Sequence, residues 1–226
     1  MTFKTILNYS PSFNPRKRNH KEIEFIIFHY TGMKKESEAI NRLTSIQSEV
    51  SSHYLIKNNG EIITLVPDLY IAWHAGKSSW KNYKSLNKNS IGIEISNPGH
   101  QFGYKKFTKK QINSLLKLSG FLIKKYKIKL KNILGHSDIS PDRKKDPGEN
   151  FPWEFLAKNK LSLWHDIEKR ILNNYRGNKV DDISQKIFLD NIFKIGYKKK
   201  IPNHIKKVKY QSLITKAFQR KYRQEL

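Results

Sequence analysis

The sequence contains no cysteine among its 226 residues. Disulfide bonds are therefore excluded, and so is any metal site that depends on thiolate ligands. A chain of this length can bury a sizeable core without cross-links and still leave room for a small second unit. The cellular compartment stays open, because an exported protein without disulfides has the same composition as a cytosolic one.

Acidic residues are scarce, with 19 Asp and Glu against 44 Lys and Arg, which gives a formal charge of +25. Such an excess favours an anionic partner, for example nucleic acid, a membrane surface or an acidic polymer. A bias toward Lys, Asn and Ile, as an A/T-rich genome produces, explains the charge equally well. We expect no specific nucleic-acid partner, because no helix-turn-helix, zinc finger or aromatic-basic RNA motif is present.

Long apolar runs are also missing. No stretch of 18 apolar residues occurs, so we expect no transmembrane segment. The first 20 residues are polar, contain Pro11 and Pro15, and lack the apolar centre of a signal peptide. The chain therefore either stays inside the cell or leaves it by a route that the sequence does not display.

Short apolar runs alternate with helical patterns along the first two thirds of the chain. We expect strands at 24–30, 53–57, 61–66, 91–95 and 131–134, with helices over 37–48 and from Thr108 onward. Asn58-Asn59-Gly60 predicts a hairpin, and Thr108 with Gln111 predicts a helix cap. The fold class is therefore α/β, with a mixed central sheet flanked by helices.

The apolar pattern stops near Asn173 and resumes at Ile183. We therefore expect a catalytic domain over 1–172, a linker over 173–182, and a small helical domain over 183–226. Helical spacing in the last part predicts helices over 183–193 and 211–222. A unit of about 45 residues has a small core and is only marginally stable by itself.

Two histidines and one aspartate lie where an α/β protein places functional side chains. His29 ends a buried strand, His136 follows another strand, and Asp146 precedes Pro147, which restricts its backbone. Two imidazoles and one carboxylate leave a fourth position open for water, which is typical of catalytic zinc. Their separation along the chain leaves ordinary hydrogen-bonded histidines as the alternative.

An ordered series of short motifs narrows these alternatives. The motifs are Phe28-His29-Tyr30-Thr31, Ser51-Ser52-His53-Tyr54, Ala72-Trp73-His74-Ala75-Gly76, Ile91-Gly92-Ile93-Glu94, Gly135-His136-Ser137-Asp138-Ile139, Arg143-Lys144-Lys145-Asp146-Pro147-Gly148 and Phe151-Pro152-Trp153. In this order they resemble the type 2 family of N-acetylmuramoyl-L-alanine amidases, over roughly residues 23–164. These amidases cut the amide bond between N-acetylmuramic acid and the L-alanine of the peptidoglycan stem peptide.

The resemblance implies one zinc ion per chain, held by His29, His136 and Asp146. It assigns the catalytic carboxylate to Glu94 and an oxyanion-stabilising cation to Lys144, whereas His53 is expected to be structural. Residues expected to border the substrate are Tyr30, Trp73, His74, Asn97 and Arg143. Core packing is the alternative for Trp73, and a solvent-facing strand position is the alternative for Glu94.

The tail contains Gly196-Tyr197 and, in its second predicted helix, Ala217-Phe218-Gln219-Arg220. Over this short match it resembles the small three-helix peptidoglycan-binding module that is fused to some of these amidases. The expected partners are therefore peptidoglycan or muropeptides, bound by a monomer. The tail favours the cell envelope as the location, whereas the missing signal-peptide pattern leaves the cytoplasm open. The competing function is a peptidoglycan-recognition protein, which shares this fold without catalysis and typically lacks one metal ligand.

Overall fold

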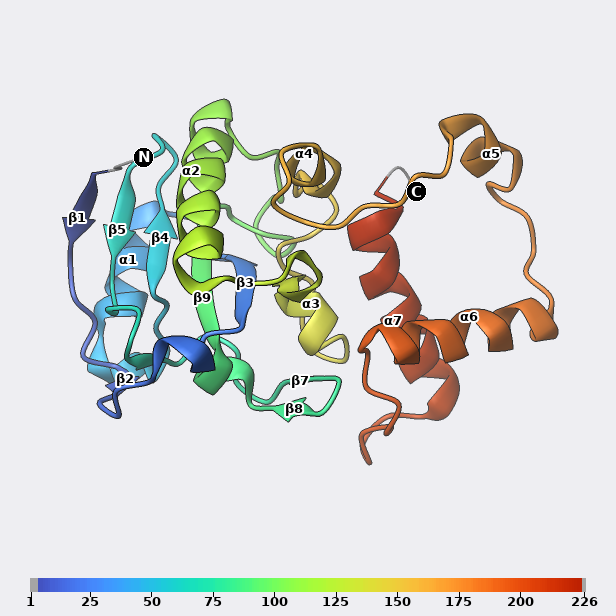
Figure 1. The fold of residues 1–226 in the computed structure, drawn as a ribbon, viewed down its shortest axis with the longest axis horizontal. Helices are drawn as coiled ribbons and strands as arrows, with labels where there is room; N and C mark the ends of the chain where they lie inside the picture. Colours follow the sequence, from blue (N-terminus) through green and yellow to red (C-terminus); the bar gives the residue numbers. More distant parts are fainter. Residues whose placement is uncertain (1–3, 225–226) are drawn as a thin grey trace.

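A six-stranded mixed sheet organises the computed structural model, which describes residues 4–224 (Figure 1). Its strand order is β1-β5-β4-β9-β3-β10, and all neighbours are parallel except β4 and β5. The strands are β1 (Thr5–Leu7), β3 (Phe25–Tyr30), β4 (Tyr54–Ile56), β5 (Ile62–Thr64), β9 (Ser90–Ile95) and β10 (Ile133–Gly135). The carboxyl ends of β3, β9 and β10 therefore meet at one edge of the sheet.

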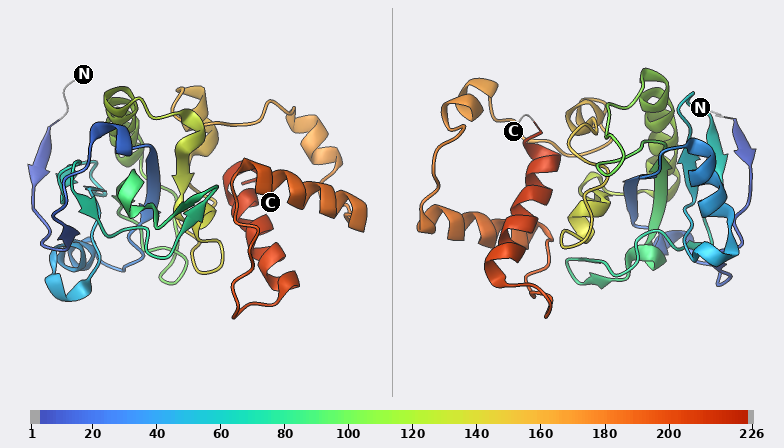
Figure 2. Two further views of the ribbon diagram at one scale, coloured as in Figure 1. Left: turned by 60° about the horizontal axis from the view of Figure 1, so that its bottom comes forward. Right: turned by 180° about the vertical axis from the view of Figure 1, so that it is seen from behind.

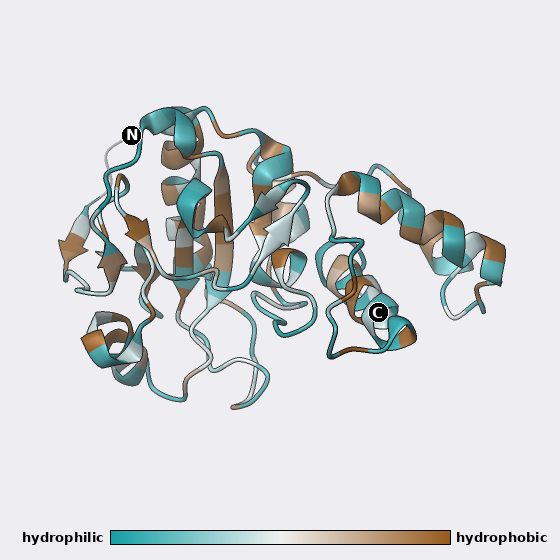
Figure 3. Ribbon diagram, turned by 90° about the horizontal axis from the view of Figure 1, so that it is seen from below, coloured by the Kyte–Doolittle hydropathy of each residue, from teal (hydrophilic) through white to brown (hydrophobic). Residues whose placement is uncertain are grey.

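Strand β3 is buried on both faces, as its apolar run predicts. Ile26 and Phe28 pack toward helix α2 (Lys109–Tyr126), whereas Phe25 and Ile27 belong to the core on the opposite face. The cap of α2 has the predicted form, because the side chains of Thr108 and Gln111 each accept a backbone N–H of the other residue. In Figure 3 the central strands are mainly brown, whereas the helices carry both teal and brown residues, as expected for amphipathic helices.

Helix α1 (Glu36–Thr44) covers β4 and β5 on the face opposite α2, where Leu43 packs against Leu55 and Ile63. The short strands pair in two small sheets, and the remaining helices lie in the second half of the chain. These elements are β2 (Phe13–Asn14), β6 (Ile71–Ala72), β7 (Ser79–Trp80), β8 (Tyr83–Lys84), α3 (His136–Ile139), α4 (Trp153–Lys158), α5 (Lys169–Asn174), α6 (Asp182–Ile195) and α7 (Lys207–Tyr222). Within residues 4–224, no helix is both long and apolar enough to cross a membrane.

Most of the predicted elements are confirmed: the strands over 24–30 and 91–95, the hairpin at Asn58-Asn59-Gly60, and the long helix after Thr108. The tail helices are also present, each a few residues longer than predicted. The chain after β10 continues directly into α3. Its third residue, Asp138, accepts the Gly135 N–H at 2.8 Å and thereby caps a helix of a single turn.

The tail packs at the β10 end of the sheet, opposite β1 (Figures 1 and 2). One apolar core contains Leu189 and Ile192 of α6 together with Ile214 of α7. The same core contains Trp80 of β7 and Leu134 of β10. The division into 1–172, 173–182 and 183–226 stays a prediction. The shared core packs the described part of the tail, residues 183–224, against the sheet.

Asp138 joins the tail to the sheet through buried polar contacts. Its carboxylate accepts the Tyr197 hydroxyl at 2.5 Å and the Lys221 ammonium at 3.2 Å. The ammonium also donates to the Ile133 carbonyl at 2.8 Å and lies 4.4 Å from the ring centre of Trp153. Lys221 is only 4% exposed, so this ion pair is shielded from water. Removing one partner would leave the other charge buried and unpaired, which is strongly destabilising.

We therefore predict that Lys221→Met lowers the free energy of unfolding by about 3 kcal/mol, since Asp138 loses its buried cation. Methionine keeps most of the aliphatic stem, so the loss reports the charge and not the packing. Denaturant unfolding monitored by circular dichroism measures it. The matched control is Lys216→Met, an exposed lysine on the same helix. Equal stability of the two variants would show that the Asp138–Lys221 pair does not hold the tail.

Candidate functional site

The site begins with two neighbouring residues on parallel strands. His29 of β3 and Glu94 of β9 are direct partners in the register of the sheet. Side chains alternate along each strand, and Ile93 and Ile95 belong to the core under α2. Glu94 therefore lies on the opposite face, together with His29, at the carboxyl edge of the sheet.

His136 and Asp146 reach the same point from one loop. His136 is the first residue of α3, directly after β10, and Asp146 precedes the cis peptide bond to Pro147. The Ser137 N–H donates to the Asp146 carbonyl at 2.8 Å, which ties the two ends of the loop together. His136 and Asp146, which lie 107 and 117 positions after His29 in the sequence, therefore become its neighbours.

Three potential ligand atoms converge on one position. The His29 Nδ1 lies 2.9 Å from the His136 Nδ1 and 3.1 Å from the Asp146 Oδ2, and the last two atoms are 3.0 Å apart. Tetrahedral zinc with bonds of about 2.0–2.1 Å separates its ligands by about 3.3 Å, so the spacing fits with a small expansion. All three residues are buried, and the group could hold a metal ion.

Protonation in the site also suits metal binding. Burial, together with the neighbouring His136, lowers the pKa of His29 to about 4, so that the imidazole is neutral at pH 7. Burial raises the pKa of Asp146, but the two adjacent imidazoles more than offset this and hold it well below its usual range. The His136 Nε2 lies 3.2 Å from the Ala75 carbonyl, which only accepts, and 3.4 Å from the Arg143 guanidinium, so the shorter contact favours the tautomer with its proton on Nε2. The lone pair of His136 is therefore on Nδ1, facing the other two ligands.

A cleft of about 790 Å³ opens above these ligands and includes both predicted catalytic residues, Glu94 and Lys144. The Glu94 Oε2 is buried and has no hydrogen-bond partner among the described residues. Burial and the nearby negative charge of Asp146 raise the pKa of Glu94 to about 8, although Lys144 counteracts them. Glu94 is thus a carboxyl group aimed into the cleft and able to exchange a proton near neutral pH.

The residues predicted to border the substrate have different surroundings. Tyr30, Trp73 and Arg143 line the cleft, and Trp73 is 36% exposed, so its ring is available for stacking. Arg143 also donates to the carbonyls of Ala75 and Lys77 at 2.6 and 2.8 Å, which holds the loop after Trp73 in place. These three side chains therefore remain candidates for substrate contact.

Asn97 and His74 use their polar atoms inside the protein. The Asn97 amide donates to the Lys105 carbonyl and accepts the Gly99 N–H, so it shapes the loop beyond β9. His74 also lines the cleft, but its two ring nitrogens contact His29 and Ser90. The polar atoms of both side chains thus have partners inside the protein, and their contact with a substrate stays a prediction.

Other residues at the cleft carried no recognisable sequence signal. Arg42 reaches the cleft from α1, and His100 and Phe102 reach it from the loop after β9. The His100 Nδ1 lies 3.0 Å from the Tyr30 hydroxyl oxygen, and its Nε2 lies 3.0 Å from the Glu149 Oε2. His53 is structural as expected: it accepts the Gly92 N–H and contacts the Tyr70 carbonyl.

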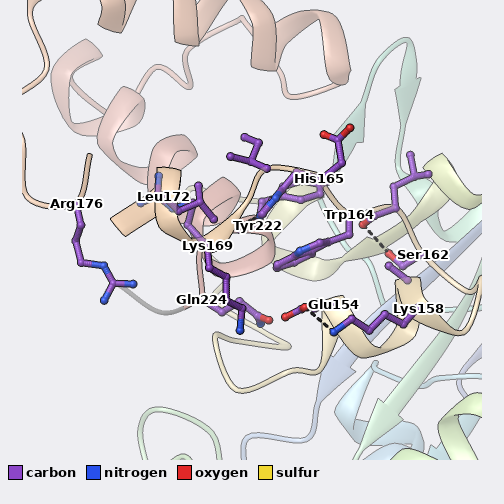
Figure 4. Close-up of a pocket in the computed structure, with 15 residues that line it drawn as sticks. Glu154, Lys158, Ser162, Trp164, His165, Lys169, Leu172, Arg176, Tyr222 and Gln224 are labelled. Carbon is purple, nitrogen blue, oxygen red and sulfur yellow. Dashed lines mark hydrogen bonds and ion pairs between the residues drawn. The ribbon is translucent and has the colours of Figure 1, made fainter. Parts of the chain in front are cut away.

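A second pocket, of about 550 Å³, lies between α4, α5 and the end of α7 (Figure 4). Trp164 stacks on His165 there, with ring centres 4.8 Å apart, and the ring centre of Tyr222 lies 6.0 Å from that of Trp164. Glu154 and Lys158 form an ion pair at its rim. This pocket shares no lining residue with the cleft at the three buried ligands.

Two imidazoles and a carboxylate, at the carboxyl edge of a mixed sheet and open to a cleft, define an α/β protein with a candidate metal centre. The sequence profile of the N-acetylmuramoyl-L-alanine amidase family matches residues 19–149, and the chain belongs to this family. The family resemblance predicted from the ordered motifs is thereby confirmed.

Similar proteins agree with this assignment. The chain is 38% identical to the N-acetylmuramoyl-L-alanine amidase AmiD of Escherichia coli over 162 residues, which is 66% of this chain and 58% of AmiD. It is 34% identical to the 1,6-anhydro-N-acetylmuramyl-L-alanine amidase AmpD of Haemophilus influenzae over 163 residues, 64% of this chain and 86% of AmpD. The aligned part thus spans less than two thirds of AmiD.

Two solved structures share the fold across nearly the whole chain. The structure of AmpDH3 from Pseudomonas aeruginosa, in complex with anhydromuramic pentapeptide, matches with a TM-score of 0.77 and 29% identity, covering 94% of this chain and 86% of that one. The E. coli AmiD complex with anhydro-N-acetylmuramic acid-L-Ala-D-gamma-Glu-L-Lys matches with a TM-score of 0.75 and 32% identity, covering 97% and 85%. The α/β fold class predicted from the sequence is confirmed.

Proposed function

We propose that this chain is a zinc-dependent hydrolase that cleaves the amide bond between the lactyl group of N-acetylmuramic acid and the L-alanine of the stem peptide. The observation that carries the proposal is the convergence of His29 Nδ1, His136 Nδ1 and Asp146 Oδ2 to within 3.1 Å, at the base of a cleft. Glu94 and Lys144 line the same cleft. Membership of the amidase family indicates which bond this arrangement would cut.

Each residue has a role that its surroundings support. Zinc held by His29, His136 and Asp146 would polarise the amide carbonyl and lower the pKa of water to about 7. Glu94 takes a proton from the attacking water and returns it to the leaving nitrogen of L-alanine. Lys144 places a positive charge beside the oxygen that becomes negative during attack. The products are a lactyl carboxylate and a peptide with a free amino group.

The cleft suits a muropeptide, which combines a sugar with an anionic peptide. The exposed ring of Trp73 offers a stacking face for the sugar, and Arg42 and Arg143 offer cations for peptide carboxylates. The two structural relatives were solved in complex with anhydromuramyl peptides. We therefore propose anhydromuramyl peptides as one substrate class for this chain.

A non-catalytic peptidoglycan-recognition protein is the competing function. Such a protein needs the cleft but not the ligands, whereas here all three ligand positions are filled and converge. The buried Glu94 oxygen beside the ligands has no hydrogen-bond partner among the described residues, and such an atom destabilises the fold. Recognition alone gives no reason to keep it, whereas proton transfer does. These features favour the amidase.

The first prediction from this proposal concerns the metal. His29→Ala, His136→Ala and Asp146→Ala should each lose zinc, because two remaining ligands hold it too weakly in an open site. Zinc per chain is measured by atomic emission after dialysis against a weak chelator. His204→Ala, an exposed histidine of the tail, is the control and should keep one zinc. Full zinc occupancy in any of the three variants would remove that residue from the ligands.

The second prediction separates chemistry from metal binding. Glu94→Gln and Lys144→Met should keep zinc and the fold, but each should lose turnover of a soluble muramyl peptide by about 10²-fold or more. Release of the free amino group measures turnover, and Lys84→Met, an exposed lysine of β8, is the control. Near-normal turnover in Glu94→Gln would place the general base elsewhere.

We also propose that the tail helices provide a second contact with the anionic cell wall. Lys198, Lys199 and Lys200 are exposed on the loop between α6 and α7. Replacing these three lysines by glutamine should weaken binding to intact sacculi at low salt and leave turnover of a soluble muramyl peptide unchanged. A sacculus pull-down at low and high salt measures the effect. Unchanged binding at low salt would exclude these lysines as a wall contact.

A further inference from the structure

His29 uses both of its ring nitrogens. Nδ1 faces His136 and Asp146, whereas Nε2 lies 3.0 Å from the Nδ1 of His74. The rings of His29 and His74 meet edge to face, at 84°. His74 is 8% exposed and its other nitrogen, Nε2, lies 3.1 Å from the Ser90 hydroxyl. The three side chains thus form a line that runs from the ligand group into the protein.

The hydrogen bond that Ser90 donates determines the direction of the other hydrogen bonds in this series of side chains. The Ser90 hydroxyl lies 2.6 Å from the Leu86 carbonyl, which can only accept, so the hydroxyl proton is committed there. The Ser90 oxygen therefore accepts from the Nε2–H of His74. A neutral imidazole carries one proton, so the Nδ1 of His74 accepts from the Nε2–H of His29. His29 is left with its lone pair on Nδ1, facing the other two ligands.

The sheet leaves a space of the right shape for the His74 ring. Ser90, Gly92 and Glu94 point to the same face of β9, and Gly92 lies beneath the ring. A Cβ atom at Gly92 would lie 2.4 Å from the His74 Cγ, so no larger residue fits while the ring keeps this place. The backbone N–H groups of His74 and Ala75 both donate to the Asn87 side chain, which fixes the segment that carries the ring.

We propose that His74, oriented by Ser90, is a positioning residue that keeps His29 in the tautomer able to bind zinc through Nδ1. The inference rests on the proposed zinc site. A histidine that binds metal through one nitrogen commonly donates its other N–H to an acceptor, and loss of such an acceptor costs about 10- to 100-fold in metal affinity. Here the acceptor is a second histidine, whose own tautomer is held by a hydroxyl group and a carbonyl.

The test compares zinc dissociation constants, measured by competition with a chromophoric chelator, in the wild type and three variants. His74→Leu keeps a side chain of similar bulk but removes the acceptor, and zinc affinity should fall by about 10- to 100-fold. His74→Asn can place an amide oxygen near the position of Nδ1, and its affinity should return to within a few-fold of the wild type. Ser90→Ala should also weaken zinc binding, although Ser90 is two side chains away from the ion.

A second measurement does not depend on zinc at all. Nitrogen-15 NMR of the zinc-free protein should show His29 protonated at Nε2 in the wild type and in His74→Asn, but a mixture of tautomers in His74→Leu. Thermal unfolding of the same variants identifies any that have lost the fold. If His74→Leu has lost it, the zinc affinities of His74→Asn and Ser90→Ala decide.

The outcomes separate the inference from the proposed function. If the wild-type chain binds no zinc, the proposed function is wrong. If the wild type binds zinc and His74→Leu binds it equally well with an unchanged His29 tautomer, the positioning role is overturned. Equal loss of zinc affinity in His74→Leu and His74→Asn would also overturn it, because packing and not the acceptor would then be responsible.

Discussion

The parallel pairing of β3 with β9 is the interaction on which the rest of the site depends. It places His29 beside Glu94, with both side chains on the face away from α2. Along β9 the buried isoleucines alternate with Ser90, Gly92 and Glu94. Ser90 therefore anchors His74, Gly92 leaves space for the His74 ring, and Glu94 supplies a carboxylate, while the isoleucines between them pack in the core. A shift of one residue in the register would exchange these groups with the core and eliminate the site.

The second constraint connects the tail to the ligands. His136 begins α3, and Asp138 in the same turn is bonded to Tyr197 and Lys221 of the tail. Both contacts are buried, so the position of the short helix depends on the packing of α6 and α7. The C-terminal helices therefore support the fold of the catalytic part, in addition to the wall contact proposed for them.

Much of this organisation could be predicted from the sequence, because it follows from local patterns. The apolar run of β3, the hairpin at Asn59 and the cap at Thr108 each act within a few residues, and the ordered motifs identified the family. The internal hydrogen bonds of His74 and Asn97 could not be predicted, since they depend on partners such as Ser90 and Lys105 that only the tertiary fold brings near. The shared core of the tail was missed for the same reason: periodicity shows an apolar face but not what it contacts.

We propose that this chain hydrolyses muropeptide amides with one zinc ion at His29, His136 and Asp146. The most direct measurement is a zinc titration of chelator-stripped protein, in which turnover of a soluble muramyl peptide and bound zinc are followed in the same samples. We expect that turnover is absent in the stripped protein, rises in proportion to bound zinc and levels off at one ion per chain. Full turnover in the stripped protein, or zinc binding at this stoichiometry without any turnover, would contradict it.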